Sequence, residues 1–526
     1  MSENRSVFQY GEDRLTVGIA LGLSRGNVQG NIGAKAASRI EKSAARVAAI
    51  VAQNEAVYGI NTGFGPLCTT RISASETNLL QVNILKSHSV GVGDPISEEL
   101  SRLMLVLKVQ ALAQGHSGIQ PKTLDRILWH LESGYTPVVP AQGSVGASGD
   151  LAPLAHLFLP LIGLGKVWKD GKIIPTATIM EPLGLEPLAL GPKEGLALIN
   201  GTQFIAAHAV LVVEKMQRCL NQADVIGAMM IEGLQGSVKP FHQGLHQLRP
   251  YSGTQHVAER MRNLLKGSEI LEEHIDCERV QDPYSLRCIP QVHGASRNAW
   301  LHLKELVEIE LNSVTDNPII LEDGEAVSGG NFHGQPLAMA LDYACLAASE
   351  VGNISDRRIY LALEGNQTDL PKLLMQDTGL NSGYMILQYT SAALASENKG
   401  LCFPASADSI PTSMGQEDHV SMGSISGRKA LQVLENVEKI LAIELLTAAQ
   451  AFEFRKPLKS GWFLEKVHNL VREHVSFAKE DRVFADDIEK GLELLRSGAL
   501  IGMLDSVSKK KKVGLKTQFE NLFESL

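Results

Sequence analysis

The sequence lacks the features that mark secreted, membrane and nucleic-acid-binding proteins. Its six cysteines are scattered, with no CxxC pair and no closely spaced set, which indicates reduced thiols rather than a disulfide framework. No apolar run approaches the roughly 18–20 residues that cross a bilayer, and residues 1–20 contain no basic start followed by an apolar stretch. The net charge of −9 argues against a nucleic-acid surface. We therefore expect a cytoplasmic protein with neither a membrane nor a nucleic-acid partner.

Motifs for metal and phosphate binding are also missing. His242 and His246 have the four-residue spacing of two zinc ligands on a helix, but the glutamate of that motif is absent, and Pro240 and Gly244 disfavour a helix. The glycines of segment 143–149 recur every three residues, which matches neither the P-loop nor the dinucleotide-binding pattern. The sequence therefore predicts no metal site and no external cofactor.

The chain is long enough for more than one core and is rich in helical patterns. Its 526 residues exceed a typical single domain, and 44% hydrophobic with 20% charged residues is ordinary for a globular protein. Apolar residues spaced by three and four predict helices, whereas strand-like alternation is rare. We expect a mainly α fold whose long helices have broad apolar faces of the kind that subunits share, and hence an oligomer. The helical segments are 203–232, 303–311 (ending before Asp316-Asn317-Pro318), 336–365 and 433–441, and the one hairpin is 166–174, turning at Asp170-Gly171.

One short segment carries unusual chemistry. Residues 143–150 read Gly-Ser-Val-Gly-Ala-Ser-Gly-Asp, and the small residues Ala147, Ser148 and Gly149 let the backbone fold tightly enough to react with itself. The amide nitrogen of Gly149 can reach the carbonyl carbon of Ala147, and loss of water closes a five-membered ring. Dehydration of Ser148 then leaves an electrophilic methylene conjugated to that ring. Pro153 suits the first turn of a following helix, whose N-terminus would stabilise negative charge on the ring.

The sequence around this triplet resembles the aromatic amino acid ammonia-lyase family, whose members build a 4-methylidene-imidazol-5-one (MIO) group from Ala-Ser-Gly. A lone triplet occurs by chance in many proteins, whereas six blocks in family order make coincidence implausible. Besides the triplet, the blocks are Tyr58–Gly65, Glu194–Thr202, Gln281–Cys288, Gly330–Gly334 and Gln416–Met422.

The resemblance implies a fold and an assembly. Members of the family belong to the fumarase/aspartase-like superfamily and are homotetramers, with a globular N-terminal domain that carries the MIO and a C-terminal domain of long helices. In this chain the domains would be residues 1–200 and 201–526, the second serving oligomerisation and completing the active sites. Each active site of the family draws on three subunits. The MIO would form autocatalytically from Ala147-Ser148-Gly149.

The resemblance also assigns roles to residues outside the triplet. Tyr58 lies in a glycine-rich loop that can move over a pocket, and the matching family tyrosine is the base that removes the β-proton. Arg287 matches the arginine that grips the substrate carboxylate, since a guanidinium offers a planar two-point contact. Tyr284 and Gln281 match residues that hydrogen-bond the MIO and shape its site, and their spacing places all three on one side of a helix or turn. Asn200 matches an asparagine that contacts the MIO or the substrate.

Three positions bear on the substrate. His88, in a Ser-His pair, is typical of the histidine branch of the family, and a polar pair can hydrogen-bond an imidazole nitrogen. A carboxylate at Glu417 would bond an imidazole N–H, whereas against a phenyl ring it would stay unpaired. Phe332 matches an aromatic residue that lines the substrate pocket. Ile289 and His293 depart from the Gln and Met of many histidine-branch members, and Ile289 is closer to the other branches.

These residues predict a carbon–nitrogen lyase that eliminates ammonia from L-histidine to give trans-urocanate, the first step of histidine degradation. Two alternatives stay open within the family, a tyrosine or phenylalanine ammonia-lyase and an MIO-dependent aminomutase, because all use the same electrophile. Outside catalysis, a helical scaffold descended from such enzymes would have lost the catalytic positions, yet Tyr58, Ser148, Asn200, Tyr284 and Arg287 are all present.

Overall fold

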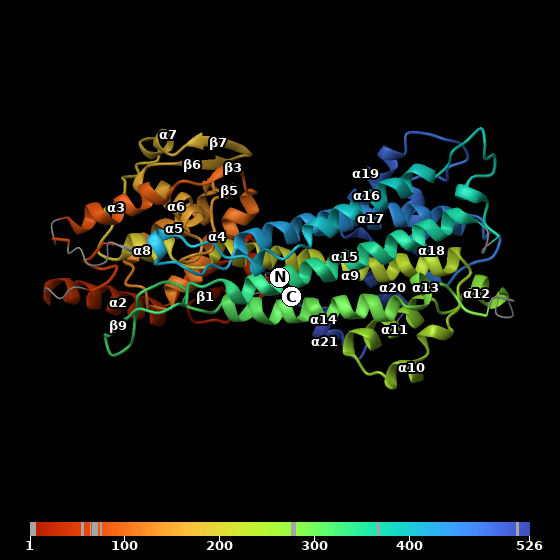
Figure 1. Cartoon of the computed structure of the whole chain (residues 1–526), viewed down its shortest axis with the longest axis horizontal. Helices are drawn as coiled ribbons and strands as arrows, with labels where there is room; N and C mark the ends of the chain where they lie inside the picture. The colour runs from red at the N-terminus through yellow and green to blue at the C-terminus, as the bar shows by residue number, and fades with distance from the viewer. Residues whose placement is uncertain are drawn as a thin grey trace.

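The computed structural model describes residues 7–53, 57–63, 65, 72–73, 76–274, 280–365, 369–511 and 515–526. The molecule is elongated, with the N-terminal elements gathered at one end and long helices extending away from them along the longest axis (Figure 1). The expected mainly α fold is confirmed. Within the described residues, no helix is both long enough and apolar enough to cross a membrane.

Four long helices form the centre of the molecule: α9 (Gln203–Gly233), α14 (Ile289–Glu310), α15 (Gln335–Glu364) and α17 (Gly423–Glu453). Helix α17 packs against α9 and α15, and α14 packs against the same two helices. Each of the four overlaps a segment for which the sequence predicted a helix, and α14 and α15 end one residue before the predicted segments do. Helix α9 is buried over most of its length, which explains why it is rich in alanine and valine and has little polar face.

Strands are short and lie mostly at the N-terminal end. The predicted hairpin is confirmed: β6 (Lys166–Lys169) and β7 (Lys172–Pro175) pair antiparallel, with Trp168 opposite Ile173. Its turn residue Asp170 has φ of 50°, the left-handed conformation that a two-residue type I′ turn requires. The other elements before α9 are β1 (Phe8–Tyr10), α1 (Val17–Ser24), β2 (Gly30–Ile32), α2 (Ala34–Gln53), α3 (Thr77–His88), β3 (Val92–Pro95), α4 (Glu98–Ala113), α5 (Pro121–Ser133), β4 (Thr136–Pro137), β5 (Pro140–Gln142), α6 (Leu151–Phe158), α7 (Ala177–Met180) and α8 (Glu194–Ile199).

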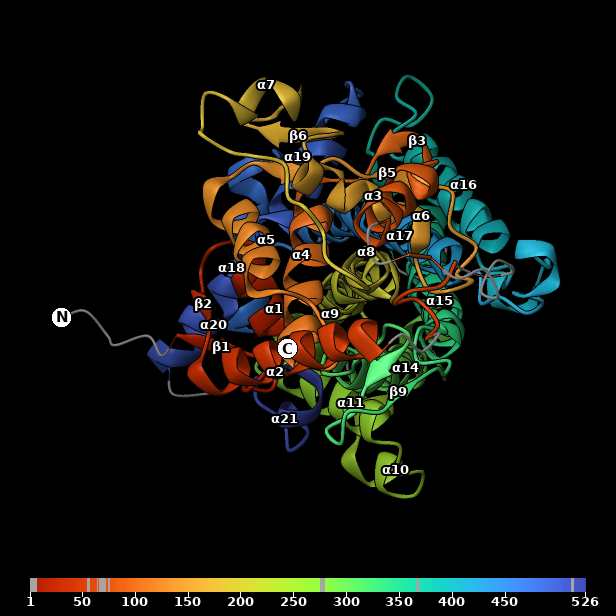
Figure 2. The ribbon, with the colours of Figure 1, turned by 90° about the vertical axis from the view of Figure 1, so that its left-hand side faces the viewer.

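Seen from its N-terminal end, the molecule shows α2 to α6 and the small strands grouped around the ends of the long helices (Figure 2). Helix α4 connects the two regions, because it packs on α1 and α5 on one side and on α9 on the other. The predicted domain boundary near residue 200 lies in the segment that joins α8 to α9, and it stays a prediction.

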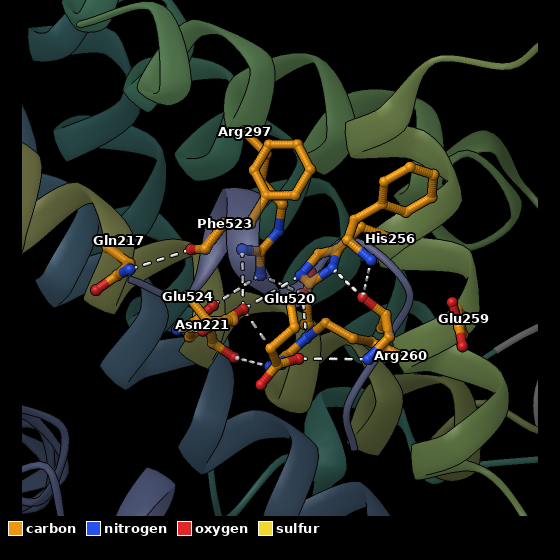
Figure 3. A network of polar contacts seen from close by, with 12 residues as sticks. Gln217, Asn221, His256, Glu259, Arg260, Arg297, Glu520, Phe523 and Glu524 are labelled. Carbon is orange, nitrogen blue, oxygen red and sulfur yellow. Dashed lines mark hydrogen bonds and ion pairs between the residues drawn. The ribbon is translucent and has the colours of Figure 1, made fainter. Parts of the chain in front are cut away.

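The end of the chain returns to the bundle. Glu524, which follows α21 (Glu520–Phe523), places Oε1 3.2 Å from His256 Nε2 and 3.5 Å from both Arg260 Nη1 and Arg297 Nη1 (Figure 3). Arg260 and Arg297 also pair with the buried carboxylate of Asp224 on α9. This network ties the last residues to α9, α11 and α14. The remaining helices and strands are α10 (Gln243–Gln247), α11 (Ser252–Leu264), α12 (Glu269–Glu273), α13 (Tyr284–Arg287), β8 (Ile319–Ile320), β9 (Ala326–Val327), α16 (Met385–Leu401), α18 (Trp462–His474), α19 (Phe484–Arg496) and α20 (Ala499–Lys511).

Candidate active site

The Ala147-Ser148-Gly149 segment lies in a tight loop between β5 and α6. Gly149 has φ of 75°, a conformation that favours glycine. A Cβ on Gly149 would lie 2.1 Å from the carbonyl oxygen of Gly201, so the space admits only glycine. The amide of Asp150 donates to the same Gly201 oxygen at 2.7 Å. The connection between α8 and α9 therefore packs directly on the triplet and holds it in a compact shape.

Asp150 joins the triplet to the start of α9. Its buried carboxylate accepts hydrogen bonds from the Phe204 and Ile205 amides, both at 3.0 Å. These donors belong to the first turn of α9, where amides have no partner within the helix. Burial nevertheless raises the pKa of Asp150 to about 7, because the hydrogen bonds offset only part of the lost hydration. Helix α6 begins at Leu151 with Pro153 in its first turn, as the sequence predicted.

Glu417 lies directly at Ser148. Ser148 Oγ donates a hydrogen bond to Glu417 Oε1 at 2.6 Å, although the two residues are 269 positions apart in the sequence. The other oxygen, Glu417 Oε2, accepts from Thr412 Oγ1 at 3.0 Å and from Ser413 Oγ at 2.8 Å. Three hydroxyl donors therefore fix the direction of this carboxylate. The structure thus brings two of the sequence-predicted site residues into contact.

His88 lies within the electrostatic reach of Glu417. It is the last residue of α3, it is half-buried, and its Nδ1 lies 3.0 Å from Ser87 Oγ. Burial lowers the pKa of His88, while its hydrogen bond to the Ile84 backbone and the negative charge of Glu417 act in the opposite direction. A carboxylate and an imidazole therefore belong to the same polar side of the site.

Phe332 lies just before α15, close to the Glu417 loop, the segment of residues 402–422 between α16 and α17. Its side chain is half-buried. The next residue, His333, stacks on His419 with ring centroids 5.7 Å apart. A Cβ on Gly334 would approach Ser421 Oγ to 3.2 Å. Because these contacts connect the two segments, the start of α15 and the Glu417 loop form one wall of the site.

Asn200 and Tyr58 lie on the α8 side of the triplet. Asn200 is 4% exposed, and its Oδ1 has no hydrogen-bond partner among the described residues. A buried acceptor without a partner is costly, so this atom is suited to a donor group that forms or binds at the site. Gly59, next to Tyr58, packs against Leu196 of α8, and the Gly65 amide donates to Tyr58 Oη at 3.4 Å.

Tyr284 and Arg287 form a second cluster. The guanidinium of Arg287 stacks on the Tyr284 ring, 4.7 Å from its centroid, and Tyr284 is 71% exposed. The Nε of Arg287 is buried without a hydrogen-bond partner among the described residues. The expected shared helical side holds for Tyr284 and Arg287 alone, because Pro283 is extended and starts the helix after Gln281. Gln281 instead lines a cavity of about 310 Å³.

The two clusters lie far apart within one chain. Helix α15 begins beside the Glu417 loop, as the Gly334–Ser421 contact shows, whereas Arg358 near its other end donates to the Ser285 carbonyl oxygen at 3.3 Å. At 1.5 Å per residue, that stretch of helix spans roughly 35 Å. Figure 1 accordingly shows α13 towards the opposite end of the molecule from α6 and α8. Arg287 and Ser148 of one chain therefore do not contribute to the same site.

Ile289 and His293, the two departures noted in the sequence, lie in the helical core and not at the triplet. Both are fully buried on α14. His293 Nδ1 lies 2.8 Å from Asp224 Oδ1. Their identities therefore concern the packing of α14 against α9.

Sequence reasoning missed several residues of the site. Thr412 and Ser413 orient Glu417, and Asp150 caps α9 instead of its own helix α6. The sequence shows Asp150 next to the triplet, but nothing local indicates that its carboxylate contacts residues 54 and 55 positions away.

Comparison with known proteins places the chain in a family. The family model described as aromatic amino acid lyase matches residues 15–473. The chain belongs to the aromatic amino acid lyase family. Among relatives of this lyase, a histidine ammonia-lyase of Sorangium cellulosum is 49% identical over 482 residues, which cover 90% of this chain and 94% of the relative. The human histidine ammonia-lyase is 46% identical over 499 residues, covering 94% of this chain and 76% of the relative.

Solved structures of other members have the same fold as this lyase. The crystal structure of histidine ammonia-lyase from Trypanosoma cruzi has a TM-score of 0.89 and 42% identity, covering 98% of this chain and 97% of that one. The tyrosine aminomutase of Streptomyces globisporus also has a TM-score of 0.89, with 36% identity, covering 95% of this chain and 99% of that one. The resemblance to the family that the sequence predicted is confirmed.

Proposed function

We propose that this lyase is a histidine ammonia-lyase, which eliminates ammonia from L-histidine to give trans-urocanate and so opens histidine degradation. The observation that carries the proposal is the Glu417 carboxylate, held by Thr412 and Ser413 beside Ser148 and acting on His88. Once Ser148 Oγ has left in MIO formation, a polar imidazole ring can satisfy Glu417 Oε1, whereas a phenyl ring would leave that oxygen unpaired, at a cost of roughly 2 kcal/mol or more. The histidine ammonia-lyases at 49% and 46% identity support the same substrate.

The triplet fits the MIO group that the family uses. Gly149 has the backbone conformation and the lack of a Cβ that ring closure needs, and Gly201 holds it in place. Asn200 presents a buried acceptor without a partner next to the loop. When formed, the MIO supplies the electrophile that activates the amino group for departure. No external cofactor is required by this scheme.

The remaining residues bind, orient and deprotonate the substrate. Arg287 would hold the substrate carboxylate in a two-point contact, with Tyr284 stacked on it. Glu417 and His88 would hydrogen-bond the imidazole ring, and Phe332 would pack on its face. Tyr58, whose hydroxyl already accepts a hydrogen bond, would take the β-proton. Gln281 and Asn200 would complete the surroundings of the reacting group.

These roles require more than one chain in each site, and we propose a homotetramer. The roughly 35 Å between the clusters supports this, because Arg287 of one chain cannot reach Ser148 of the same chain. Apolar side chains on α15 and α16 also support it: Met339 is 60% exposed, Leu346 51% and Tyr389 60%. Faces of this kind are normally covered by another subunit.

A cytoplasmic location also remains part of the proposal. The four cysteines among the described residues, Cys219, Cys288, Cys345 and Cys402, are free thiols, in keeping with a reducing compartment.

The test offers purified protein L-histidine, L-tyrosine and L-phenylalanine separately and follows the ultraviolet absorbance of the conjugated acid. We expect urocanate from L-histidine alone. Coumarate or cinnamate as the main product would contradict histidine as the substrate while retaining the lyase chemistry. A β-amino acid product, identified by chromatography, would instead indicate an aminomutase. The structural relative from Streptomyces globisporus is an enzyme of that name.

A further inference from the structure

Lys108 is a buried cation that the proposed chemistry does not use. It lies on α4, is 1% exposed, and forms no ion pair within the described residues. Its neighbour Lys193 is equally buried but pairs with Asp316, Nζ to Oδ2 at 2.7 Å. Burial lowers the pKa of Lys108 to about 7. The positive charge of Lys193 acts in the same direction, whereas the negative charges of Asp316 and Asp150 act in the opposite direction. A lysine kept in such surroundings needs a reason other than ion pairing.

The contacts of Lys108 lead to the triplet. Its Nζ donates to the Asn200 carbonyl oxygen at 2.5 Å and to Gln203 Oε1 at 3.4 Å. The Asn200 carbonyl shares its peptide plane with the nitrogen of Gly201. The Gly201 oxygen in turn accepts from the Asp150 amide and lies against Gly149. One hydrogen bond of Lys108 thus fixes the backbone that forms the back wall of the Ala147–Gly149 segment.

We propose that Lys108 is a positioning residue for MIO formation, acting through the Asn200–Gly201 backbone. The inference rests on the proposed function. Without Lys108, the Asn200 carbonyl would be buried without a donor, and one of the hydrogen bonds that hold the Asn200–Gly201 backbone against Gly149 would be lost. The compact shape of the triplet would then be less populated, and ring closure would slow.

The chemistry at stake is balanced without any co-reactant. A bond forms between Gly149 N and the Ala147 carbonyl carbon, and the carbonyl oxygen leaves as water with the amide protons of Ser148 and Gly149. The Ser148 Cβ–Oγ bond then breaks, and Oγ leaves as a second water with its own proton and the Ser148 Cα proton. A matured chain is therefore lighter by two water molecules, which intact mass spectrometry detects without any activity assay.

The test follows this mass loss over time after synthesis in a cell-free system, for the full-length wild-type chain and Lys108→Met. We expect the rate at which the variant loses its two waters to be at least about tenfold lower than that of the wild type, because one hydrogen bond from a charged donor has been removed. Near-ultraviolet absorbance of the MIO should fall in proportion, while circular dichroism keeps its helical signature. Lys108→Arg, which keeps the charge and the donor, should mature faster than Lys108→Met.

Lys193→Met is the matched control. It removes a buried lysine that donates to the Ser117 carbonyl oxygen and pairs with Asp316, so it should lower the melting temperature without slowing the mass loss. If Lys108→Met does not fold, Lys108→Gln, which keeps a neutral donor, is measured by the same criterion. A folded Lys108→Met chain, or the Lys108→Gln chain measured in its place, that matures at the wild-type rate would overturn this inference alone. A wild-type chain that retains both waters would overturn the proposed function as well.

Discussion

At the scale of single residues, the Glu417 carboxylate is the feature by which the proposed site would distinguish an imidazole substrate from a hydrocarbon ring. Hydroxyls of Thr412 and Ser413 donate to its Oε2 and remain after Ser148 Oγ has left in MIO formation, so its orientation is set before any substrate arrives. Binding an N–H group at such a fixed acceptor costs little rearrangement. In the proposed site, selectivity for the substrate ring would thus depend on the charge of one side chain.

We predict that Glu417→Gln lowers kcat/KM for L-histidine by roughly 10- to 100-fold, the effect of losing one charge-assisted hydrogen bond. The mass loss of two waters should persist, because the Gly149–Gly201 packing is untouched. Steady-state urocanate formation and intact mass measure the two effects. The matched control is Asp418→Asn, the neighbouring exposed carboxylate, which should leave both unchanged. Wild-type activity of Glu417→Gln would remove the basis for histidine as the substrate.

The sequence identified Ser148, Glu417 and His88, because motifs and side-chain chemistry are local properties. It did not identify Lys108, which has no motif around it and whose importance comes from a contact 92 positions along the chain. Asp150 illustrates the same limit, since a carboxylate before a helix normally caps that helix. Here the Asp150 carboxylate instead accepts from two amides of α9.

At the scale of elements, the last helix is held by charge. Burial alone would raise the pKa of Glu524, but the hydrogen bond with His256 and the charges of Arg260 and Arg297 lower it to about 2. An unfolded glutamate titrates near ~4.3. Because the folded value is the lower one, the stabilisation by this group is complete above about pH 5 and is lost as the pH falls towards 2.

We predict that Glu524→Gln lowers the free energy of unfolding by about 3 kcal/mol at pH 7, as expected when one partner of a buried ion pair is removed. The difference from wild type should shrink as the pH falls below the ordinary glutamate pKa. Denaturant unfolding at several pH values measures it. Glu489→Gln, the same change at an exposed position on α19, should have almost no effect. A difference that grows on acidification would show that the sign of the pKa shift is wrong.

The long helices were predictable because apolar residues at spacings of three and four span whole buried faces, as in α14 and α17. The short helix α13 was harder to predict from the sequence. Pro283 stands immediately before it, and Pro290 lies in the first turn of the next helix, so the segment between them is confined to one turn. Side-chain spacing alone does not reveal such a short helix.

At the scale of the whole molecule, the site residues divide into two clusters that no single chain unites. The triplet, Glu417 and Phe332 gather at one end, and Tyr284 and Arg287 lie near the other. The sequence contains all of them but carries no information on the distance between them, because that distance depends on how α13 packs against α15. Assembly is thus the step at which the proposed active site becomes complete.

We predict subunit complementation between the clusters. Ser148→Ala and Arg287→Gln should each be inactive alone, and equal co-expression should restore activity in about a quarter of the sites, since half the chains supply each intact cluster. The control pairs Ser148→Ala with Glu417→Gln, which lie in contact within one chain, and should give no more activity than Glu417→Gln alone. Mixed oligomers of Ser148→Ala and Arg287→Gln chains would be isolated with two affinity tags. If they stay inactive, the two clusters do not meet in one site.

Helix α15 sets the spacing between these clusters, and its length is therefore a functional quantity in its own right. It begins just after Gly334, which packs against Ser421, and its far end contacts the segment that carries Arg287. Inserting one residue in the middle would advance one end by 1.5 Å and rotate it by about 100° relative to the other. Many single substitutions along the exposed face of α15 would leave that geometry intact, whereas any change in residue count would shift the two clusters of the proposed site relative to each other. The length of α15 fixes the distance between the two clusters. Insertions and deletions in this helix are therefore the changes that we expect the enzyme to tolerate least.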